Sequence, residues 1–424
     1  MLTPERIMAW AIPGFFVLIA IEFAVARWRG RPQAYRANDA INSLGLGMLS
    51  QIVGVFTRLF NVGVYAWFAE HLAPWSLPAD RVWVWISGLL LYDFLYYWLH
   101  RGGHRVALLW AAHVVHHQSE RYNLTTALRQ TGTGFLLGWV FYLPMALLGY
   151  PVAVFAVIAL IDLLYQFWVH TEQIGRLGWF DRVFCSPSNH RAHHAVNERY
   201  LDRNYGGILI VWDRLFGSFV EESDSDPPVY GTRSPLRSWN PLWANVEVYW
   251  TLWRSARHAR RWRDRLQVWL RPPGWRPADA HGDTTVPRFD IDHAPFDPPI
   301  SRALRAYCLI QFGLLLLMGM HFLRVATRLG GVEAAGYALW LVAGLCTIGL
   351  LLERRRGAAW LEVLRVLGMA VIPLACGRWF GVTHLDIRLG LAMLVVFGAS
   401  ALALPWMHAH DDGHGPRSDR VTTG

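Results

Sequence analysis

The chain has 424 residues, of which 54% are hydrophobic and only 17% are charged, and its mean hydropathy is positive at +0.22. This balance is unusual for a soluble chain of this length and indicates a polytopic membrane protein. The 40 basic residues are all arginine and outnumber the acidic residues by nine. Because the arginines flank the apolar stretches, they favour contact with anionic lipid headgroups, and we expect no nucleic-acid partner. The four cysteines lack paired spacing, so no disulfide framework is expected.

Apolar stretches that approach the ~20 residues needed to cross a bilayer recur along the chain. They cover residues 10–26, 41–69, 82–99, 135–149, 152–169, 303–323, 332–352, 358–376 and 388–406. The pair Tyr150-Pro151 divides the stretch from 135 to 169, which we interpret as a helical hairpin that enters the membrane without fully crossing it.

Arginine clusters set the expected orientation. They follow the first and the seventh apolar stretch, at Arg27, Arg29, Arg31 and Arg36 and at Arg354, Arg355 and Arg356. Both loops are therefore expected on the cytoplasmic side. Counting spans from either cluster places residues 100–117 and 180–299 on that side as well. The fold class predicted is an all-α, polytopic integral membrane helical bundle with a cytosolic, histidine-rich helical cap.

Five parts are expected along the chain. They are N-terminal membrane helices (1–81), a metal-binding catalytic domain (82–238), a Trp/Arg-rich interfacial segment with a linker (239–301), C-terminal membrane helices (302–407) and a polar tail (408–424). The Trp/Arg mixture suits a helix in the headgroup layer. A helix packed on the catalytic domain, with a solvated arginine face, is the alternative. The C-terminal helices are interpreted as scaffold or as a wall for a lipid pocket, and the tail as a disordered tract.

Half of the eighteen histidines form one pattern. It comprises His100 and His104; His113, His116 and His117; the single His170; and His190, His193 and His194. Residues three and four apart on a helix share a face, so each cluster points its imidazoles at one spot. Neutral imidazole suits iron, copper and zinc, and eight or nine nitrogens exceed what one ion can use, so the pattern predicts a dinuclear centre. The isolated histidines, which are His71, His258, His281, His293, His321 and His384, are expected to be ordinary polar residues, as are those of the tail, His408, His410 and His414.

The clusters stand at or beyond the ends of the apolar stretches. A metal transporter would bury its ligands midway along the spans, on the permeation path. Ligands at the ends instead indicate a cap with access to lipid, as an enzyme acting on bilayer substrates needs. A metal-binding transporter or sensor remains the non-enzyme alternative, and it predicts no consumption of O2.

The donor set favours oxygen activation on iron. Hydrolytic two-metal sites usually contain bridging carboxylates, whereas no Asp or Glu is repeated inside these motifs. Asp93 lies two helical turns before His100, and Glu120 lies three residues after His117. Both are expected to accept the second imidazole N–H and so orient the ligands. Weaker candidates for the same role are Asn123, Glu172, Asp181 and Asn189.

Three stretches resemble the fatty acid hydroxylase/sterol desaturase superfamily. They are DFLYYWLHRGGH at 93–104, HVVHHQSERYNLTTALRQ at 113–130 and NHRAHH at 189–194. Within that superfamily, NLTTALRQ at 123–130 and NYGGILIVWDRLFG at 204–217 look most like the alkylglycerol monooxygenase branch. The catalytic resemblance covers about residues 92–222, and the spans after residue 302 also fit that branch.

The resemblance implies a non-haem di-iron enzyme that inserts one atom of O2 beside the ether oxygen of an alkylglycerol, which then yields fatty aldehyde and glycerol. The eight histidines of the three motifs carry over as iron ligands, and His170 is the additional family histidine. The electrons come from tetrahydrobiopterin in the animal members, and that cofactor is carried over by the resemblance alone. A hydroxylase or desaturase of a fatty acyl, sterol or carotenoid substrate is the alternative. The expected partners are a bilayer lipid and a separate electron donor that docks on the arginine-rich surface.

Overall fold

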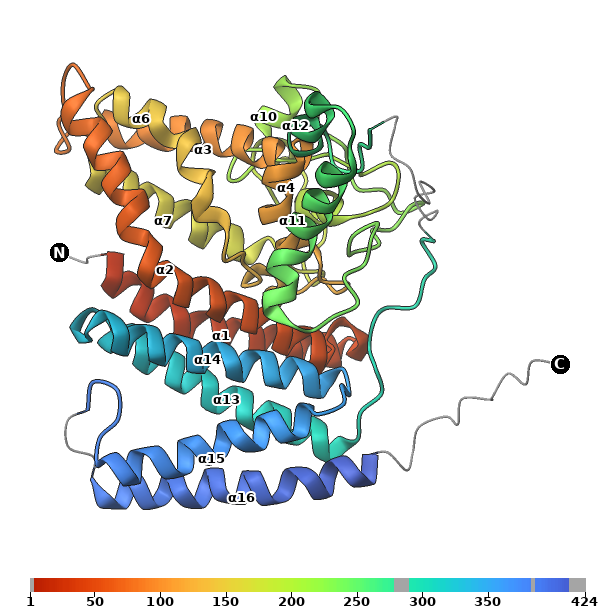
Figure 1. The fold of residues 1–424 in the computed structure, drawn as a ribbon. Helices are drawn as coiled ribbons and strands as arrows, with labels where there is room; N and C mark the ends of the chain where they lie inside the picture. The colour runs from red at the N-terminus through yellow and green to blue at the C-terminus, as the bar shows by residue number, and fades with distance from the viewer. Residues whose placement is uncertain (1–3, 278–289, 383–385, 412–424) are drawn as a thin grey trace. The chain divides into compact units, whose positions relative to one another are not determined.

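The structure, a computed structural model, describes residues 4–277, 290–382 and 386–411. Within those ranges the chain forms α-helices and short 3-10 helices, with isolated β-bridges and no strand (Figure 1). The predicted all-α class is confirmed. His281, His384 and His414 lie outside the described residues, as do the side chains of His408 and His410.

The chain divides into two compact units. The first comprises Met1–Arg237 and Leu242–Phe296, and the second comprises Ser238–Pro241 and Asp297–Gly424. All nine patterned histidines belong to the first unit.

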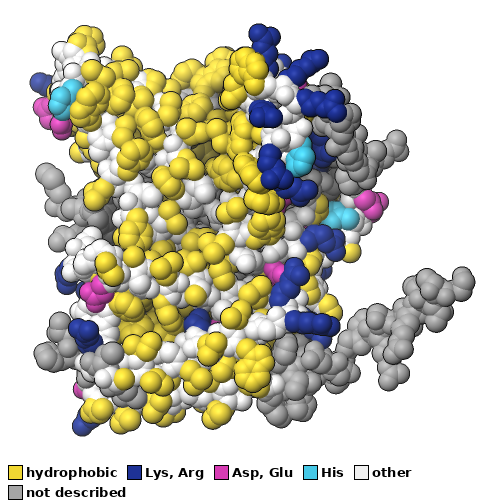
Figure 2. All heavy atoms as spheres, viewed as in Figure 1, with side chains coloured by type: hydrophobic (Ala, Val, Ile, Leu, Met, Phe, Trp, Pro, Cys, Tyr) yellow, Lys and Arg dark blue, Asp and Glu magenta, His cyan; other side chains and the backbone are white. Residues whose placement is uncertain are grey.

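Six helical segments in the described parts of the chain are long and apolar enough to cross a membrane. They are Ala11–Trp28, Pro32–Thr57, Val82–Arg105, Arg302–Arg328, Gly331–Leu352 and Ile387–Pro405. Hydrophobic side chains dominate the visible surface over α2 and α3, while arginines gather over α11 and α12 (Figure 2). The expectation of a multi-pass membrane protein is confirmed on length and composition.

The first unit begins with long helices that lead to the histidines. These are α1 (Pro4–Trp28), α2 (Ala37–His71), α3 (Val82–Arg105), α4 (Ala107–His117) and the short α5 (Leu124–Ala127). Val106 alone separates α3 from α4, and its extended backbone (φ −124°, ψ 117°) folds α4 back onto α3. The helices are close at Gly103, where a Cβ would come into van der Waals contact with His113 at 3.4 Å. The end of α3 and the whole of α4 are thereby held side by side.

The stretch 135–149 is not the single helix predicted from its composition. It forms η2 (Gly134–Leu136), η3 (Gly138–Tyr142) and α6 (Leu143–Leu147), followed by α7 (Val152–Trp168). Glycine lowers helix stability and Pro144 lacks the backbone N–H, so the stretch breaks into short turns. The predicted division at Tyr150-Pro151 is confirmed, since it separates α6 from α7. Buried apolar residues of α2, α3, α6 and α7 form one core, which includes Tyr65, Val84, Tyr92, Leu95, Met145, Val154 and Ile158.

The rest of the first unit contains α8 (Phe180–Val183), α9 (Pro187–His194), α10 (Val211–Leu215), α11 (Pro241–His258) and α12 (Trp262–Leu270). Helix α9 begins with standard signals, because Ser186 caps the N–H of Asn189 and Pro187 occupies the first turn. In its described residues the Trp/Arg-rich segment forms two helices, α11 and α12. Trp250 and Trp262 are exposed on them, while the N–H of Ala107 donates to the carbonyl of Arg271 at 3.0 Å, just after α12. The segment therefore packs on the catalytic region and also presents an apolar face.

The second unit consists of α13 (Arg302–Val325), η4 (Ala326–Arg328), α14 (Gly331–Leu352), α15 (Ala358–Cys376) and α16 (Ile387–Asp411). A buried ion pair joins Arg365 to Glu362, which is fully buried, within α15. Gln311 and Thr347 hydrogen-bond the same pair from α13 and α14. Such satisfied polar groups link helices in an apolar environment, which fits the scaffold interpretation of this unit.

Candidate metal centre

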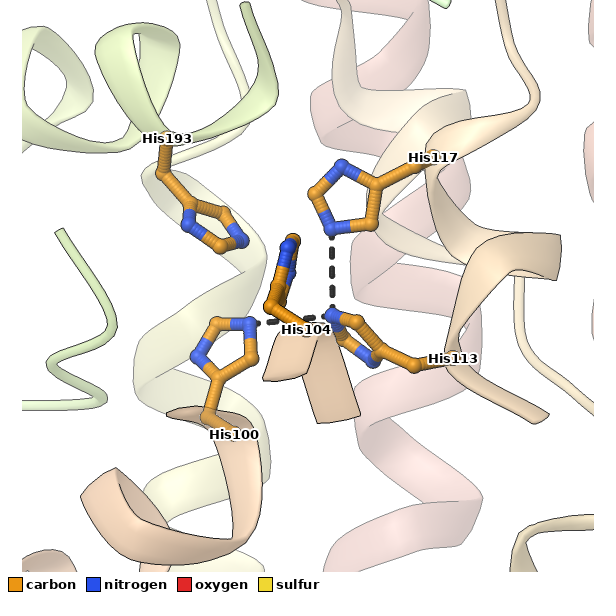
Figure 3. A group of neighbouring side chains, drawn as sticks. All are labelled: His100, His104, His113, His117 and His193. Carbon is orange, nitrogen blue, oxygen red and sulfur yellow. Dashed lines mark hydrogen bonds between the residues drawn. The ribbon is translucent and has the colours of Figure 1, made fainter. Parts of the chain in front are cut away.

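The nine patterned histidines converge in two neighbouring groups. The five-histidine group contains His100, His104, His113, His117 and His193 (Figure 3). The four-histidine group contains His116, His170, His190 and His194. Within each group the candidate ligand atoms all lie within 4.8 Å of one another. The chain thus brings together every histidine that the spacing singled out, from helices far apart in the sequence.

The two His-x-x-His-His motifs each serve both groups. In the first motif His113 and His117 join the five-histidine group, whereas His116 joins the four-histidine group. Residues four apart lie almost above one another on a helix, while a neighbouring residue points about 100° away. The motif on α9 follows the same rule with opposite assignment, because His190 and His194 face the four-histidine group and His193 faces the other. One motif can therefore bridge two metal positions.

Backbone carbonyls fix the outer nitrogen of four rings. The Nδ1 atoms of His100, His116, His170 and His193 lie 2.8, 3.0, 2.7 and 2.9 Å from the carbonyl oxygens of Tyr205, Arg129, Gln166 and Arg203. A carbonyl only accepts, so each Nδ1 carries the proton and each Nε2 presents a lone pair. This is the usual arrangement behind a metal-bound histidine.

The Nε2 atoms of His116 and His170 lie 3.0 Å apart, and because both Nδ1 atoms donate to carbonyls, two lone pairs face each other there. The Nε2 atoms of His100 and His113 are equally close, at a distance that also permits a hydrogen bond from one ring to the other. About 3 Å separates neighbouring donors around one ion when each nitrogen lies ~2.1 Å from it. Three further Nε2 atoms, on His104, His193 and His194, are buried without a hydrogen-bond partner in the described structure. Both groups therefore fit a transition-metal ion.

Burial keeps these rings in the neutral form that binds metals. It lowers the pKa of His116 to about 4. The pKa values of the other histidines beyond the membrane-spanning segment are well below the ordinary 6.5, because burial, reinforced by neighbouring rings, disfavours the charged imidazolium; they are His113, His117, His170, His190, His193 and His194.

The predicted contacts of Asp93 and Glu120 with imidazole are wrong. Asp93 instead accepts from the N–H groups of Ile208 and Leu209, at 2.7 and 3.1 Å. It also accepts from the indole of Trp212 at 2.8 Å. The carboxylate thus faces the loop after α9 and anchors it, while that loop's own carbonyls hold the rings.

Glu120 also points away from the rings. It accepts from His293 Nε2 at 3.1 Å and from the N–H of Phe296 at 2.6 Å, so it ties down the segment around residue 293. Asn123 caps α5, accepting from the N–H of Thr125 and donating to the carbonyl of Ala34, both at 2.9 Å. Its role is local and structural rather than a contact with a ligand.

The weaker candidates are likewise engaged elsewhere. Glu172 hydrogen-bonds Tyr230, and burial raises its pKa. Asp181 accepts from the N–H of Leu177 at 2.6 Å. Asn189 donates to the carbonyls of Asp181 and Phe184, at 3.0 and 3.2 Å. These contacts shape the loops before α9 rather than the imidazoles.

Sequence reasoning missed the residues that do orient the rings. The carbonyl acceptors belong to residues of any type, so no sequence signal could have revealed them. The Asp202 carboxylate lies beside His104, with Oδ1 3.6 Å from His104 Nδ1. The backbone of Asp202 is left-handed (φ 57°). Asp213 is fully buried and accepts from the N–H groups of Tyr205 and Gly206, so it sets the loop that holds His100.

Comparison with known proteins agrees with this site. Residues 85–218, which include all nine histidines of the two groups, match the family model described as fatty acid hydroxylase. The fold and the site thus define a membrane-bound lipid-oxidising enzyme of the histidine-rich class. No solved structure matches the chain significantly.

The relatives narrow this class. The chain is 35% identical to alkylglycerol monooxygenase of Homo sapiens over 84% of its own length and 80% of the relative's. It is 37% identical to alkylglycerol monooxygenase of Danio rerio over 84% and 79%. The chain is also 31% identical to the ornithine lipid hydroxylase OlsE of Rhizobium tropici, in a shorter match that covers 32% of this chain and 41% of the relative. The chain belongs to the alkylglycerol monooxygenase family and is an oxidoreductase, as the resemblance predicted.

Proposed function

We propose that this chain is a di-iron monooxygenase that cleaves the ether bond of 1-O-alkylglycerols to fatty aldehyde and glycerol. One observation carries the proposal. Nine histidines fall into two groups of buried, converging nitrogens in a chain that is 35% identical to a named alkylglycerol monooxygenase over four fifths of that relative.

The donor set supports two irons, one for each group. When bound, they would supply the redox chemistry that activates O2. In the overall reaction one oxygen atom enters the C–H bond beside the ether oxygen, and the other leaves as water with two electrons and two protons from a donor. The resulting hemiacetal breaks its C–O bond to the glycerol oxygen, which gives the aldehyde and glycerol.

The chain's own residues prepare this site in two ways. The carbonyls behind His100, His116, His170 and His193 hold the rings in one tautomer, so the donors are oriented before any ion arrives. Three of these rings, those of His100, His170 and His193, are at most 4% exposed, and burial lowers the pKa of His116 to about 4. Both effects lower the reorganisation that metal binding and turnover require.

The position of the site supports a bilayer substrate. His100 lies near the end of the membrane-spanning α3, and His170 follows directly after the apolar α7. A lipid whose chain lies among these helices would present its polar end to the two groups. We place the histidines on the cytoplasmic side, where a reduced pterin or a separate donor protein would deliver electrons. The arginine clusters flanking the spans support that orientation.

Hydroxylation of another lipid is the second candidate. The match with an ornithine lipid hydroxylase favours it, although that match covers only 32% of this chain. A metal transporter is disfavoured, because its ligands would lie midway along the spans rather than at their ends.

The test uses membranes of a host that expresses the chain, incubated with labelled 1-O-hexadecylglycerol and O2, with and without reduced tetrahydropterin. Release of labelled fatty aldehyde is expected, and it should disappear in a His116→Ala variant. A parallel panel of fatty acyl, sterol and ornithine lipids identifies the second candidate. Product from one of those lipids, with none from the alkylglycerol, would refute ether cleavage.

A further inference from the structure

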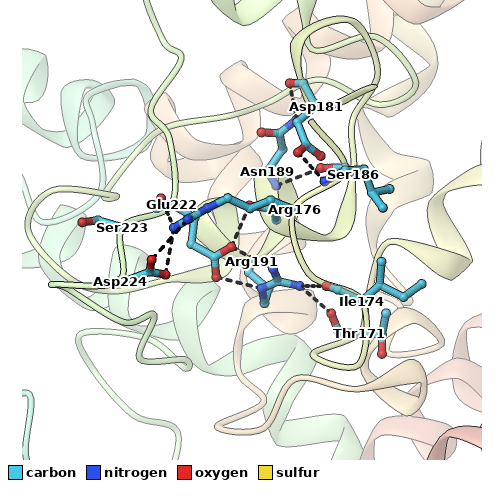
Figure 4. A network of polar contacts seen from close by, with 12 residues as sticks. Thr171, Ile174, Arg176, Asp181, Ser186, Asn189, Arg191, Glu222, Ser223 and Asp224 are labelled. Atoms are coloured by element: carbon cyan, nitrogen blue, oxygen red, sulfur yellow. Dashed lines mark hydrogen bonds and ion pairs between the residues drawn. The ribbon is translucent and has the colours of Figure 1, made fainter. Parts of the chain in front are cut away.

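One arginine stands inside the third histidine motif and contacts no histidine through its guanidinium. Arg191 lies on α9 between His190 and His193, and only 7% of it is exposed. Its guanidinium pairs with both oxygens of Glu222, at 2.8 and 2.7 Å (Figure 4). Two-pronged pairs of this kind are the most directional charged contacts in proteins.

The same guanidinium also holds the segment that follows His170. Arg191 Nη1 donates to the carbonyl of Thr171 at 2.9 Å and to that of Ile174 at 2.7 Å. Ser188, also on α9, donates to Glu222 at 2.6 Å and closes the arrangement. We call Arg191, Glu222 and the carbonyls of Thr171 and Ile174 the Arg191 clamp. It ties α9 to the residues next to His170.

The two histidine groups differ in how they are assembled. Four of the five members of the first group come from the α3–α4 pair, within residues 100–117. The four-histidine group draws on three separate segments, since His116 lies on α4, His170 follows α7, and His190 and His194 lie on α9. The distance between His170 and α9 is therefore not set by local helix geometry.

The clamp spans this gap. The Nε2 atoms of His170 and His190 lie 3.0 Å apart. Arg191, which follows His190, hydrogen-bonds the carbonyl of Thr171, which follows His170. Among the described residues drawn in Figure 4, Arg191 and Glu222 form the arginine–carboxylate pair in which both side chains are mostly buried, at 8% and 13% exposed. Arg176 forms the outer arm: it pairs with Asp224, whose side chain is 92% exposed, at 2.9 Å, and it donates to the backbone carbonyl of Glu222 but not to the Glu222 carboxylate.

We infer that Arg191 and Glu222 are positioning residues that hold the four-histidine group in its metal-binding shape, so that loss of the clamp releases one metal ion and spares the other. This inference rests on the proposed function, because it requires that both groups bind metal. The five-histidine group would keep its ion, since His100, His104, His113 and His117 stay fixed by α3 and α4.

The experiment measures bound iron rather than activity alone. The full chain, in detergent, is stripped of metal and titrated anaerobically with Fe²⁺, and bound iron is counted by mass spectrometry. The variants are Arg191→Gln and Glu222→Gln, with Arg176→Gln as the control from the exposed arm. His170→Ala serves as a reference in which the four-histidine group alone loses a ligand.

We expect wild type and Arg176→Gln to bind roughly two ions per chain, while both clamp variants bind the second ion about 10- to 100-fold more weakly. The clamp variants should then match His170→Ala in stoichiometry. Combining Arg191→Gln with His170→Ala should cause no further loss, since both changes act on one group.

The possible outcomes test the inference separately from the proposed function. Wild type that binds no iron refutes the proposed function itself. Two tightly bound ions in Arg191→Gln refute the clamp, as does loss of both ions from a variant with native helix content by circular dichroism. If Arg191→Gln does not fold, Arg191→Lys keeps the charge but not the two-pronged geometry. Unchanged affinity for the second ion in that variant refutes the clamp, and weakened affinity supports it.

Discussion

His116 and His170 are 54 positions apart, yet their Nε2 atoms lie 3.0 Å from one another. Behind each ring, a backbone carbonyl accepts from Nδ1, at 3.0 Å for His116 and 2.7 Å for His170. The two lone pairs thus face each other in a buried place, and neither ring can rotate without giving up its carbonyl. A cation between them removes the repulsion, which makes this pair the most direct sign of a metal in the four-histidine group.

Removing one ring from either group should abolish turnover. We expect His116→Ala, in the four-histidine group, and His193→Ala, in the five-histidine group, each to reduce aldehyde release from alkylglycerol by at least about 100-fold. A pair of metal ions acts as a unit, so the two losses should be similar in size. The measurement is the initial rate with labelled substrate at equal protein content.

His258→Ala is the matched control. This histidine is exposed on α11, and its Nδ1 contacts only the carbonyl of Arg254 in its own helix turn. His281 and His414, which lie outside the described residues, are expected to behave in the same way. Comparable loss of turnover in these variants and in His193→Ala would contradict the assignment of the site.

The positions of the ligands were predictable because periodicity reports directly on helix faces. Spacings of three and four placed His113, His116 and His117 on adjoining sides of α4, and the ends of the apolar stretches located them at the membrane boundary. The same reasoning predicted most long helices. It failed for residues 135–149, where hydrophobicity alone cannot tell a continuous helix from a series of short turns.

The supports of the ligands were not predictable. Asp93 and His100 share one face of α3 in sequence, yet the loop that contains Tyr205 comes between them and takes the carboxylate for its own N–H groups. Which loop folds back onto a helix depends on long-range packing. The acceptors behind the rings are backbone carbonyls. Every residue type has one, so the sequence cannot indicate which carbonyls hold the rings.

Replacing Asp213 with alanine should destabilise the first unit. The carboxylate is fully buried and accepts from the N–H groups of Tyr205 and Gly206, at 2.8 and 2.7 Å, and from the Ser218 hydroxyl at 2.7 Å. The two buried N–H groups would lose their acceptor, while the Ser218 hydroxyl keeps its contact with Tyr97 Oη at 2.8 Å, so the cost is at least about 2 kcal/mol. A clearly lower thermal midpoint in detergent is expected.

The Asp213→Ala variant should also bind iron more weakly, because the loop that Asp213 holds contains the Tyr205 carbonyl, which orients His100. Asp80→Ala is the control, as its side chain is 76% exposed beside Arg81 and should change the midpoint little. Equal midpoints for Asp213→Ala and wild type would show that the loop is held by other contacts.

Acidification should destabilise the metal-free protein. Burial holds the pKa of His116 at about 4 in the folded chain, against 6.5 ordinarily, and the pKa of His170 is lowered as well. Below pH 6.5 the unfolded chain therefore binds more protons than the folded chain. The stability is full above that pH and is lost as the pH falls from about 6.5 towards about 4.

Thermal midpoints of the metal-free protein, measured between pH 8 and pH 5, test the predicted loss of stability on acidification. The midpoint should fall on the acid side, and it should fall less in a variant that carries glutamine at positions 116 and 170. A midpoint that rises towards pH 5 would mean that the rings are charged in the folded chain, and their role as neutral metal ligands would be refuted.

Gly47 in α2 should tolerate no side chain. A Cβ at this position would overlap the carbonyl oxygen of Leu128, a backbone atom that cannot move without shifting its neighbours. The next carbonyl, that of Arg129, accepts from His116 Nδ1 at 3.0 Å. We therefore expect Gly47→Ala to lower stability by roughly 1–3 kcal/mol and to weaken binding of one iron, because the displaced segment turns the His116 ring.

The same helix supplies the control. A Cβ on Gly63 would meet nothing within 4 Å, so Gly63→Ala should be neutral or stabilising by up to about 1 kcal/mol, as alanine favours helix. Thermal midpoints and iron titrations of both variants separate local strain from a general effect on α2. If Gly47→Ala and Gly63→Ala behave alike, then contact between α2 and the Leu128 carbonyl does not set the position of His116.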